Sequence, residues 1–182
     1  CIAWPELERA NAESSYRGQP GLLGESLRRA GMASAAIGNS DDRALVCRPA
    51  VLAAMDARAT VPWSDLGTRT VASAPHAPFG VVCDVRAMAE AAATAITTAT
   101  ATAAADAVAD VGTAAGGAGA MPVAALVLDM GDFARLRRYA VNLSSEAYDV
   151  QLRLCYERLD ALLVELERLL GPPSDRLAYV LV

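Results

Sequence analysis

Two aspartates follow a continuous apolar segment and are the sharpest candidates for chemistry in the sequence. Residues 123–128 are all apolar, which predicts a strand buried on both faces, and Asp129 and Asp132 come directly after it. In a parallel sheet, ligands bind beyond the carboxyl ends of the strands. Two carboxylates there, with Gly131 permitting close approach of the backbone, suit a divalent metal ion. The alternative is structural: one carboxylate caps the following turn and the other pairs with a nearby arginine.

A second polar group follows another short apolar segment. Residues 32–37 predict a strand, and the polar residues 39–42 come after Gly38. Asn39 is the residue of this group that we expect to contact a substrate. The alternative is an Asx turn, in which an Asn or Asp side chain bonds the backbone of its own loop.

Other charged residues give weaker signals. Arg135, Arg137 and Arg138 follow Asp132 and could meet an anionic substrate, or they could lie at a solvated helix start. His76 stands in a proline-rich loop, where it could act as a ligand or general base, or could be merely exposed.

The elements that must position these groups are read from hydrophobic spacing and from capping residues. The spacing predicts helices at 21–30, 50–55, 84–111 and 145–170, and strands at 32–37, 68–74, 123–128 and 177–182. Asp84, and Ser144 or Ser145, are the expected N-caps of the two long helices. Strands alternating with helices predict an α/β fold in three layers, a mainly parallel sheet with helices on both faces.

The ends of the chain and one internal segment bear on domain organisation. We expect residues 1–182 to form a single α/β domain, or an incomplete fragment of a larger one, because the chain starts at Cys1 and ends in an apolar segment. Residues 112–120 are Gly and Ala with one Thr, which predicts a flexible linker. An unpaired strand edge in such a fragment could drive homodimer formation.

Composition excludes several classes of protein. All 16 basic residues are Arg, which excludes a Schiff-base lysine and the P-loop lysine, and a single His excludes a His-rich metal site. The net charge of -5 argues against a nucleic-acid partner. The four cysteines lack zinc-site spacing; we expect Cys155 in the core and keep a Cys1–Cys47 disulfide as an alternative.

Two segments resemble the alkaline phosphatase-like superfamily, which includes sulfatases, phosphopentomutases and nucleotide pyrophosphatases. Residues 16–39 resemble its helix–glycine–strand segment, whose pattern is L-G-x-x-L-x-x-A-G-x-x-T-A-x-x-G. Residues 127–132, followed by Tyr148, Asp160, Leu163 and the strand at Leu177, resemble the block that carries its Asp-x-x-Gly-His motif. The chain is most similar to actinobacterial and related bacterial members, many of them secreted or membrane-anchored.

The resemblance implies a metal-dependent hydrolase of phosphate or sulfate esters. The whole protein would bind Zn²⁺, Mn²⁺ or Mg²⁺, and a metal-activated nucleophile would attack a small anionic ester in line. Asp129 matches the metal-binding Asp of the family. The partner His is missing, because Asp132 or Phe133 stands in its place, and sulfatases tend to carry Lys where this chain has Asn39. The family's nucleophile would lie before residue 1, and its Asp-His pair after Val182.

Three hypotheses therefore remain open. The chain could be the central fragment of such a hydrolase, inactive by itself, from an extracytoplasmic or membrane-anchored parent. It could be a degenerate member that binds a ligand or partner without catalysis. It could also be an unrelated structural α/β ectodomain.

Overall fold

The centre of the fold is a parallel sheet of three strands. The computed structural model describes residues 4–15, 18–42, 44–109 and 121–172. The strand order is β2-β1-β5, with β1 at Ala33–Gly38, β2 at Trp63–Asp65 and β5 at Val123–Asp129. Both neighbours run parallel to β1, so the carboxyl ends of all three strands lie at one edge of the sheet. The predicted parallel strands at 32–37 and 123–128 are confirmed, but β5, which was predicted to be buried on both faces, is only partly buried, with Ala124 exposed.

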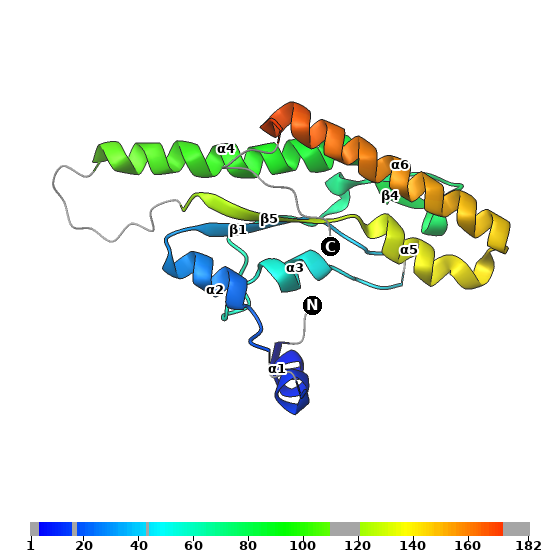
Figure 1. Cartoon of the computed structure of the whole chain (residues 1–182), viewed down its shortest axis with the longest axis horizontal. Coiled ribbons are helices and arrows are strands. Elements are labelled where there is room, and N and C mark those ends of the chain that lie inside the picture. The colour runs from blue at the N-terminus through cyan, green and yellow to red at the C-terminus, as the bar shows by residue number, and fades with distance from the viewer. Residues whose placement is uncertain (1–3, 16–17, 43, 110–120, 173–182) are drawn as a thin grey trace.

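Helices cover both faces of this sheet (Figure 1), which makes the chain a mixed α/β protein. The helices are α1 (Trp4–Glu13), α2 (Leu22–Arg29), α3 (Pro49–Ala54), α4 (Val85–Ala109), α5 (Gly131–Tyr139) and α6 (Ser145–Leu170). In Figure 1, α4 and α6 lie above the sheet, and α2 and α3 lie below it. The four helices predicted from spacing correspond to α2, α3, α4 and α6.

Strand β1 explains why both faces are covered. All six of its residues are buried. Ile37 packs into the core cluster that α4 and α6 form with Met88 and Leu162, while Ala36 packs against Ala50 and Ala54 of α3. Side chains alternate between the faces of a strand, so one short segment anchors two helical layers.

The caps expected for the two long helices are present. The Asp84 carboxylate accepts the backbone N–H of Ala87 at 3.0 Å, and the Ser144 hydroxyl accepts that of Ala147 at 3.2 Å. Each bond satisfies a donor in the first helical turn that has no partner within the helix.

The region between β2 and α4 differs from the prediction of a single edge strand at 68–74. A 3₁₀ turn at Thr68–Thr70 comes first, closed by the Thr70 hydroxyl, which donates to the Gly67 carbonyl at 2.9 Å. The strand that follows, β3 (Val71–Ser73), pairs antiparallel with β4 (Val81–Cys83) in a separate hairpin. A second 3₁₀ turn, Pro78–Gly80, lies in the connection that was predicted to be a loop.

Two helices were missed. α1 was not expected at all, and α5, which is separated from β5 by a single residue, was expected only as the possible solvated helix start around Arg135, Arg137 and Arg138. α5 is short and rich in arginine, so it lacks the long apolar stripe by which a helix is predicted from sequence.

Several predictions lie outside the described residues. These are the linker at 112–120, the strand at 177–182 and the pairing of Cys1 with Cys47. Among the helices that the structure describes, none is long and apolar enough to cross a membrane.

Candidate functional site

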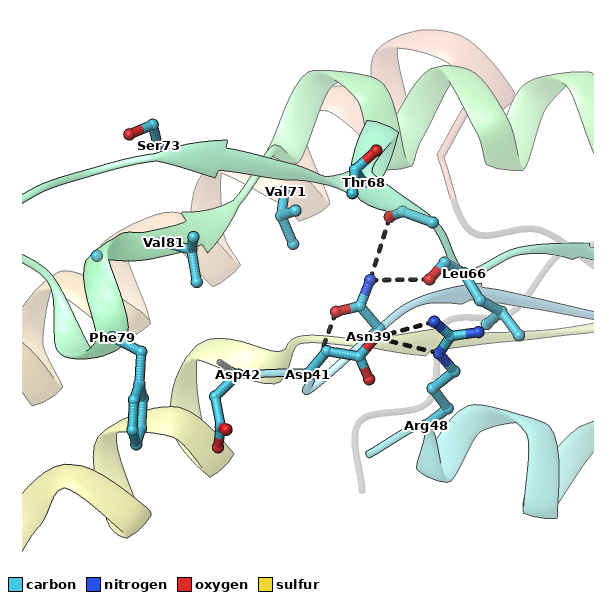
Figure 2. A pocket seen from close by; sticks show the side chains of 12 residues that line it. Asn39, Asp41, Asp42, Arg48, Leu66, Thr68, Val71, Ser73, Phe79 and Val81 are labelled. Carbon is cyan, nitrogen blue, oxygen red and sulfur yellow. Dashed lines mark hydrogen bonds and ion pairs between the residues drawn. The ribbon is translucent and has the colours of Figure 1, made fainter. Parts of the chain in front are cut away.

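A pocket of about 410 Å³ opens at the carboxyl edge of the sheet, between the loop that follows β1 and the β3–β4 hairpin (Figure 2). We call it the edge pocket. Its polar wall carries Asn39, Asp41, Asp42 and Arg48; its other wall and rim carry Leu66, Gly67, Thr68, Val71, Ser73, Phe79, Gly80 and Val81.

Asn39 lines the edge pocket, but its side chain is bound to the fold. Its carboxamide nitrogen donates to the carbonyls of Leu66 at 2.9 Å and Gly67 at 3.1 Å, as Figure 2 shows. Its oxygen accepts the backbone N–H of Asp41 at 3.1 Å, which closes an Asx turn. The structure therefore contains the Asx turn that was the alternative to a substrate contact.

Asp41 and Arg48 form an ion pair on the wall of the pocket. Nε and Nη2 of Arg48 lie 3.2 and 3.0 Å from Oδ2 of Asp41, and Oδ1 of Asp41 accepts the backbone N–H of Cys47 at 2.8 Å. The side chains are 38% exposed for Arg48 and 24% for Asp41, so a molecule in the pocket could contact both.

Asp42 is held more tightly. Its side chain is only 4% exposed; it accepts the backbone N–H groups of Ala44 and Leu45, and Arg138 Nε lies 2.9 Å from it. Burial works to raise the pKa of Asp42, but the two backbone donors and Arg138 outweigh it and hold that pKa below its ordinary value. Asp42 is therefore a fixed negative charge, paired from α5.

Arg135 joins α5 to the same loop from inside the protein. Its side chain is 1% exposed, and Nη1 donates to the carbonyls of Asn39 and Asp41 at 3.0 and 3.3 Å. Arg138 also donates to the carbonyl of Ser40. Of the three clustered arginines, only Arg137 is exposed. Arg135 and Arg138 therefore hold the loop in place, which the spacing of the arginines did not reveal.

Asp132, predicted as a metal ligand, is 3% exposed and has partners on both carboxylate oxygens. Oδ1 accepts from Arg135 Nη2 and from the backbone N–H of Cys83, both at 2.9 Å. Oδ2 accepts from Arg158 Nε on α6 at 2.7 Å. The pairing with Arg135 is the structural alternative that the sequence left open. A metal ion at Asp132 would have to displace one of these arginines.

Asp129, the other predicted metal ligand, has a different environment. It ends β5 and is half-buried, and the Ser40 hydroxyl lies 2.9 and 3.0 Å from its two oxygens. Within the described chain, no salt bridge joins it to an arginine. Burial raises the pKa of Asp129 above its ordinary value, against the lowering effect of the Ser40 bond and of Arg135. This carboxylate has unused capacity to accept hydrogen bonds or bind a cation.

The described residues provide only part of a divalent metal site. No group of three or more His, Cys, Asp or Glu side chains capable of holding a metal occurs in the part of the chain that the structure describes. Zinc takes about four ligands, and magnesium about six. Asp129 could supply one of them, while His76 lies exposed on the hairpin connection. The described residues alone do not complete such a site.

Two cysteines lie close to the buried ion pairs but are poor nucleophiles. Cys83 accepts from Arg135 Nη2 at 3.3 Å, and burial raises the pKa of its thiol to about 12. Cys155 is 2% exposed, which confirms its expected place in the core. Burial raises the pKa of its thiol as well. A thiol reacts as its thiolate, so neither residue is activated at neutral pH.

The apolar wall of the edge pocket carries a strained residue that sequence reasoning missed. Phe79 has φ +59, in the left-handed region that residues other than Gly rarely adopt. Its ring packs edge-to-face on Tyr139, with 5.2 Å between ring centroids. Strain of this kind persists where the surrounding structure enforces it, and it clusters at ligand-binding sites.

Comparison of the chain with protein-family models, with curated proteins and with solved structures finds no match. The alkaline phosphatase-like resemblance therefore stays a prediction.

Proposed function

We propose that the chain binds a small polar molecule in the edge pocket. The observation that carries this proposal is the open pocket itself, placed beside charged groups that remain partly exposed. Asn39, Asp42 and Asp132 are committed to holding the fold, whereas Asp41 and Arg48 form a pair that a ligand could reach.

The position and size of the pocket support this proposal. It lies outside the carboxyl end of β1, the place where open α/β sheets bind their ligands. Its volume of about 410 Å³ falls within the range of roughly 300–1,000 Å³ that is usual for small-molecule sites. Polar and charged side chains make up half of its lining residues, a larger share than in most small-molecule sites, which favours a polar ligand.

Ligand-observed NMR with a library of small polar molecules tests the proposal, using the 182-residue chain. We expect saturable binding that weakens in Arg48→Gln and persists in Arg86→Gln. Arg86 is the matched control because it is an exposed arginine, also paired with a carboxylate, on α4. Binding that is equally weak in both variants, or absent altogether from the folded chain, would contradict the proposal.

A second function has one specific observation in its favour. The half-buried Asp129 carboxylate stands at the carboxyl edge with a hydroxyl group as its partner. This environment fits the role that the resemblance implies, one ligand of a divalent metal in a phosphate- or sulfate-ester hydrolase. A metal bound there would polarise an ester oxygen, and its remaining ligands would come from residues other than those described.

Hydrolysis assays separate the two functions. Phosphate mono- and diesters and a sulfate ester are offered to this chain and to the complete gene product with Zn²⁺, Mn²⁺ or Mg²⁺. The hydrolase proposal expects metal-dependent turnover that Asp129→Ala abolishes and Asp160→Ala, on the exposed face of α6, does not. Absence of turnover from folded complete protein with all three metals would leave ligand binding as the function.

A further inference from the structure

We propose that the ligand of the edge pocket is a neutral saccharide or a closely related polyol. This inference rests on the proposed binding function and adds the chemical class of the ligand. It depends on three features of the pocket: compensated charges, a reachable carboxylate–guanidinium pair and an aromatic wall.

The charges of the polar wall disfavour an ionic ligand. Asp41 is paired with Arg48 and Asp42 with Arg138, at 3.0 and 2.9 Å, so each carboxylate of the wall has an arginine partner, although Arg138 itself is not among the residues that line the pocket. Two carboxylates line the pocket against one arginine, and an anionic ester would approach both of them. A cation would have to compete with arginines that are already in place. An uncharged ligand meets neither obstacle.

The Asp41–Arg48 pair suits neighbouring hydroxyl groups. A hydroxyl both donates and accepts, so two adjacent hydroxyls can give a proton to a carboxylate and accept one from a guanidinium. In the described structure, Nε and Nη2 of Arg48 bond Asp41, and Nη1 remains for a ligand. Hydrogen bonds to a carboxylate or a guanidinium are stronger than bonds between neutral groups.

The opposite wall suits the C–H face of a sugar ring. Val71 and Val81 project from the hairpin toward the loop (Figure 2), and Phe79, whose ring packs on Tyr139 of α5, also lines the pocket. Contacts of C–H groups with an aromatic ring are weak individually but favour a flat, partly apolar ring over a compact ion. Thr68 and Ser73, both exposed, add hydroxyls at the rim.

Isothermal titration calorimetry with three classes of probe tests the inference on the 182-residue chain. The neutral class is glucose, galactose, mannose, N-acetylglucosamine, trehalose and myo-inositol; the anions are inorganic phosphate and sulfate; the cation is ethanolamine. We expect at least one neutral probe to bind saturably. Its affinity should fall about tenfold in Phe79→Gly and in Arg48→Gln and stay unchanged in Arg86→Gln.

Phe79→Gly keeps the fold testable, because Gly adopts the left-handed conformation without strain. Phe79→Tyr should retain binding, whereas Phe79→Leu, which is apolar but lacks the ring, should lose it. Binding of phosphate, sulfate or ethanolamine without any neutral probe would overturn the saccharide inference and leave the binding function standing. Absence of binding by all three classes would overturn both.

Discussion

At the scale of single residues, Asp132 links several elements at the carboxyl edge of the sheet. It pairs with Arg135 and Arg158 and accepts a backbone N–H from the hairpin, so one carboxylate joins α5, α6 and β4. Arg135 in turn holds the loop after β1 through two carbonyls. The polar wall of the edge pocket therefore depends on charges buried behind it.

Removing the Asp132 charge should be severe. Asp132→Asn keeps the shape but leaves Arg135, which is 1% exposed, without its ion-pair partner. We expect a loss of about 3–5 kcal/mol in the free energy of unfolding, measured by urea denaturation. Asp160→Asn on the exposed face of α6 is the control, with a change of about 0.5 kcal/mol or less. Equal urea midpoints for the two variants would show that the charge of Asp132 does not stabilise the fold.

At the scale of elements, the start of α5 packs directly against the loop after β1. Gly131, the first residue of α5, has no room for a side chain: a Cβ there would lie 2.1 Å from the Asn39 carbonyl oxygen and 2.7 Å from Ser40 Cα. This close approach lets Arg135 and Arg138 reach the loop.

Gly131→Ala should separate α5 from that loop. We expect it to cost about 1–3 kcal/mol of stability by overpacking, and to weaken binding in the edge pocket because Asn39 and Asp41 shift. Thermal denaturation and ligand titration measure the two effects. Gly18→Ala is the control, since Gly18 does not line the pocket and a Cβ there would meet only the Asn11 side chain, at an ordinary 3.4 Å. Unchanged stability and binding in the Gly131→Ala variant would show that the contact is dispensable.

The elements that could be predicted from sequence are those with a strong local pattern. The apolar segments that became β1 and β5, and the helical spacing of apolar residues over 145–170 that became α6, are patterns within single stretches of the chain. The N-caps at Asp84 and Ser144 were predictable for the same reason, because a cap bonds within its own first turn.

The candidate site was harder, because its contacts are long-range. Asp129 and Asp132 stood out from their place after β5, yet the partner Arg158 is 26 residues from Asp132. The loop carbonyls that Arg135 bonds are more than 90 residues away. The left-handed Phe79 has no sequence signature, since Gly or Asn would be the expected residues there. The position of Asp129 and Asp132 in the sequence could identify them as candidates, but it could not identify the residues they bond.

At the scale of the whole molecule, two aspartates of the carboxyl edge should affect stability with opposite sign. The folded-state pKa of Asp42 is lowered, so it stabilises the fold above its ordinary pKa of 3.8, and that contribution is lost as pH falls through the folded value. The folded-state pKa of Asp129 is raised, so its ionisation destabilises the fold as pH rises through that value.

The same substitution at both sites tests this reasoning. In chelator-containing buffer at neutral pH, Asp129→Asn should raise the urea midpoint and Asp42→Asn should lower it. On acidification, the Asp129 difference should disappear at a higher pH than the Asp42 difference. Shifts of the same sign in the two variants would contradict the environments described for these carboxylates.

The tight enclosure of β1 has a consequence for how this protein can change over generations. Added volume in β1 presses on α3 or on α4, and at Gly38 a Cβ would lie 2.5 Å from the Asp129 carbonyl oxygen. Exposed positions such as Thr68 and Ser73 face no such limit. Tolerated mutations should therefore accumulate at the rim of the edge pocket while the strand beneath it stays fixed, so that the surface of the pocket can diversify on a constant scaffold.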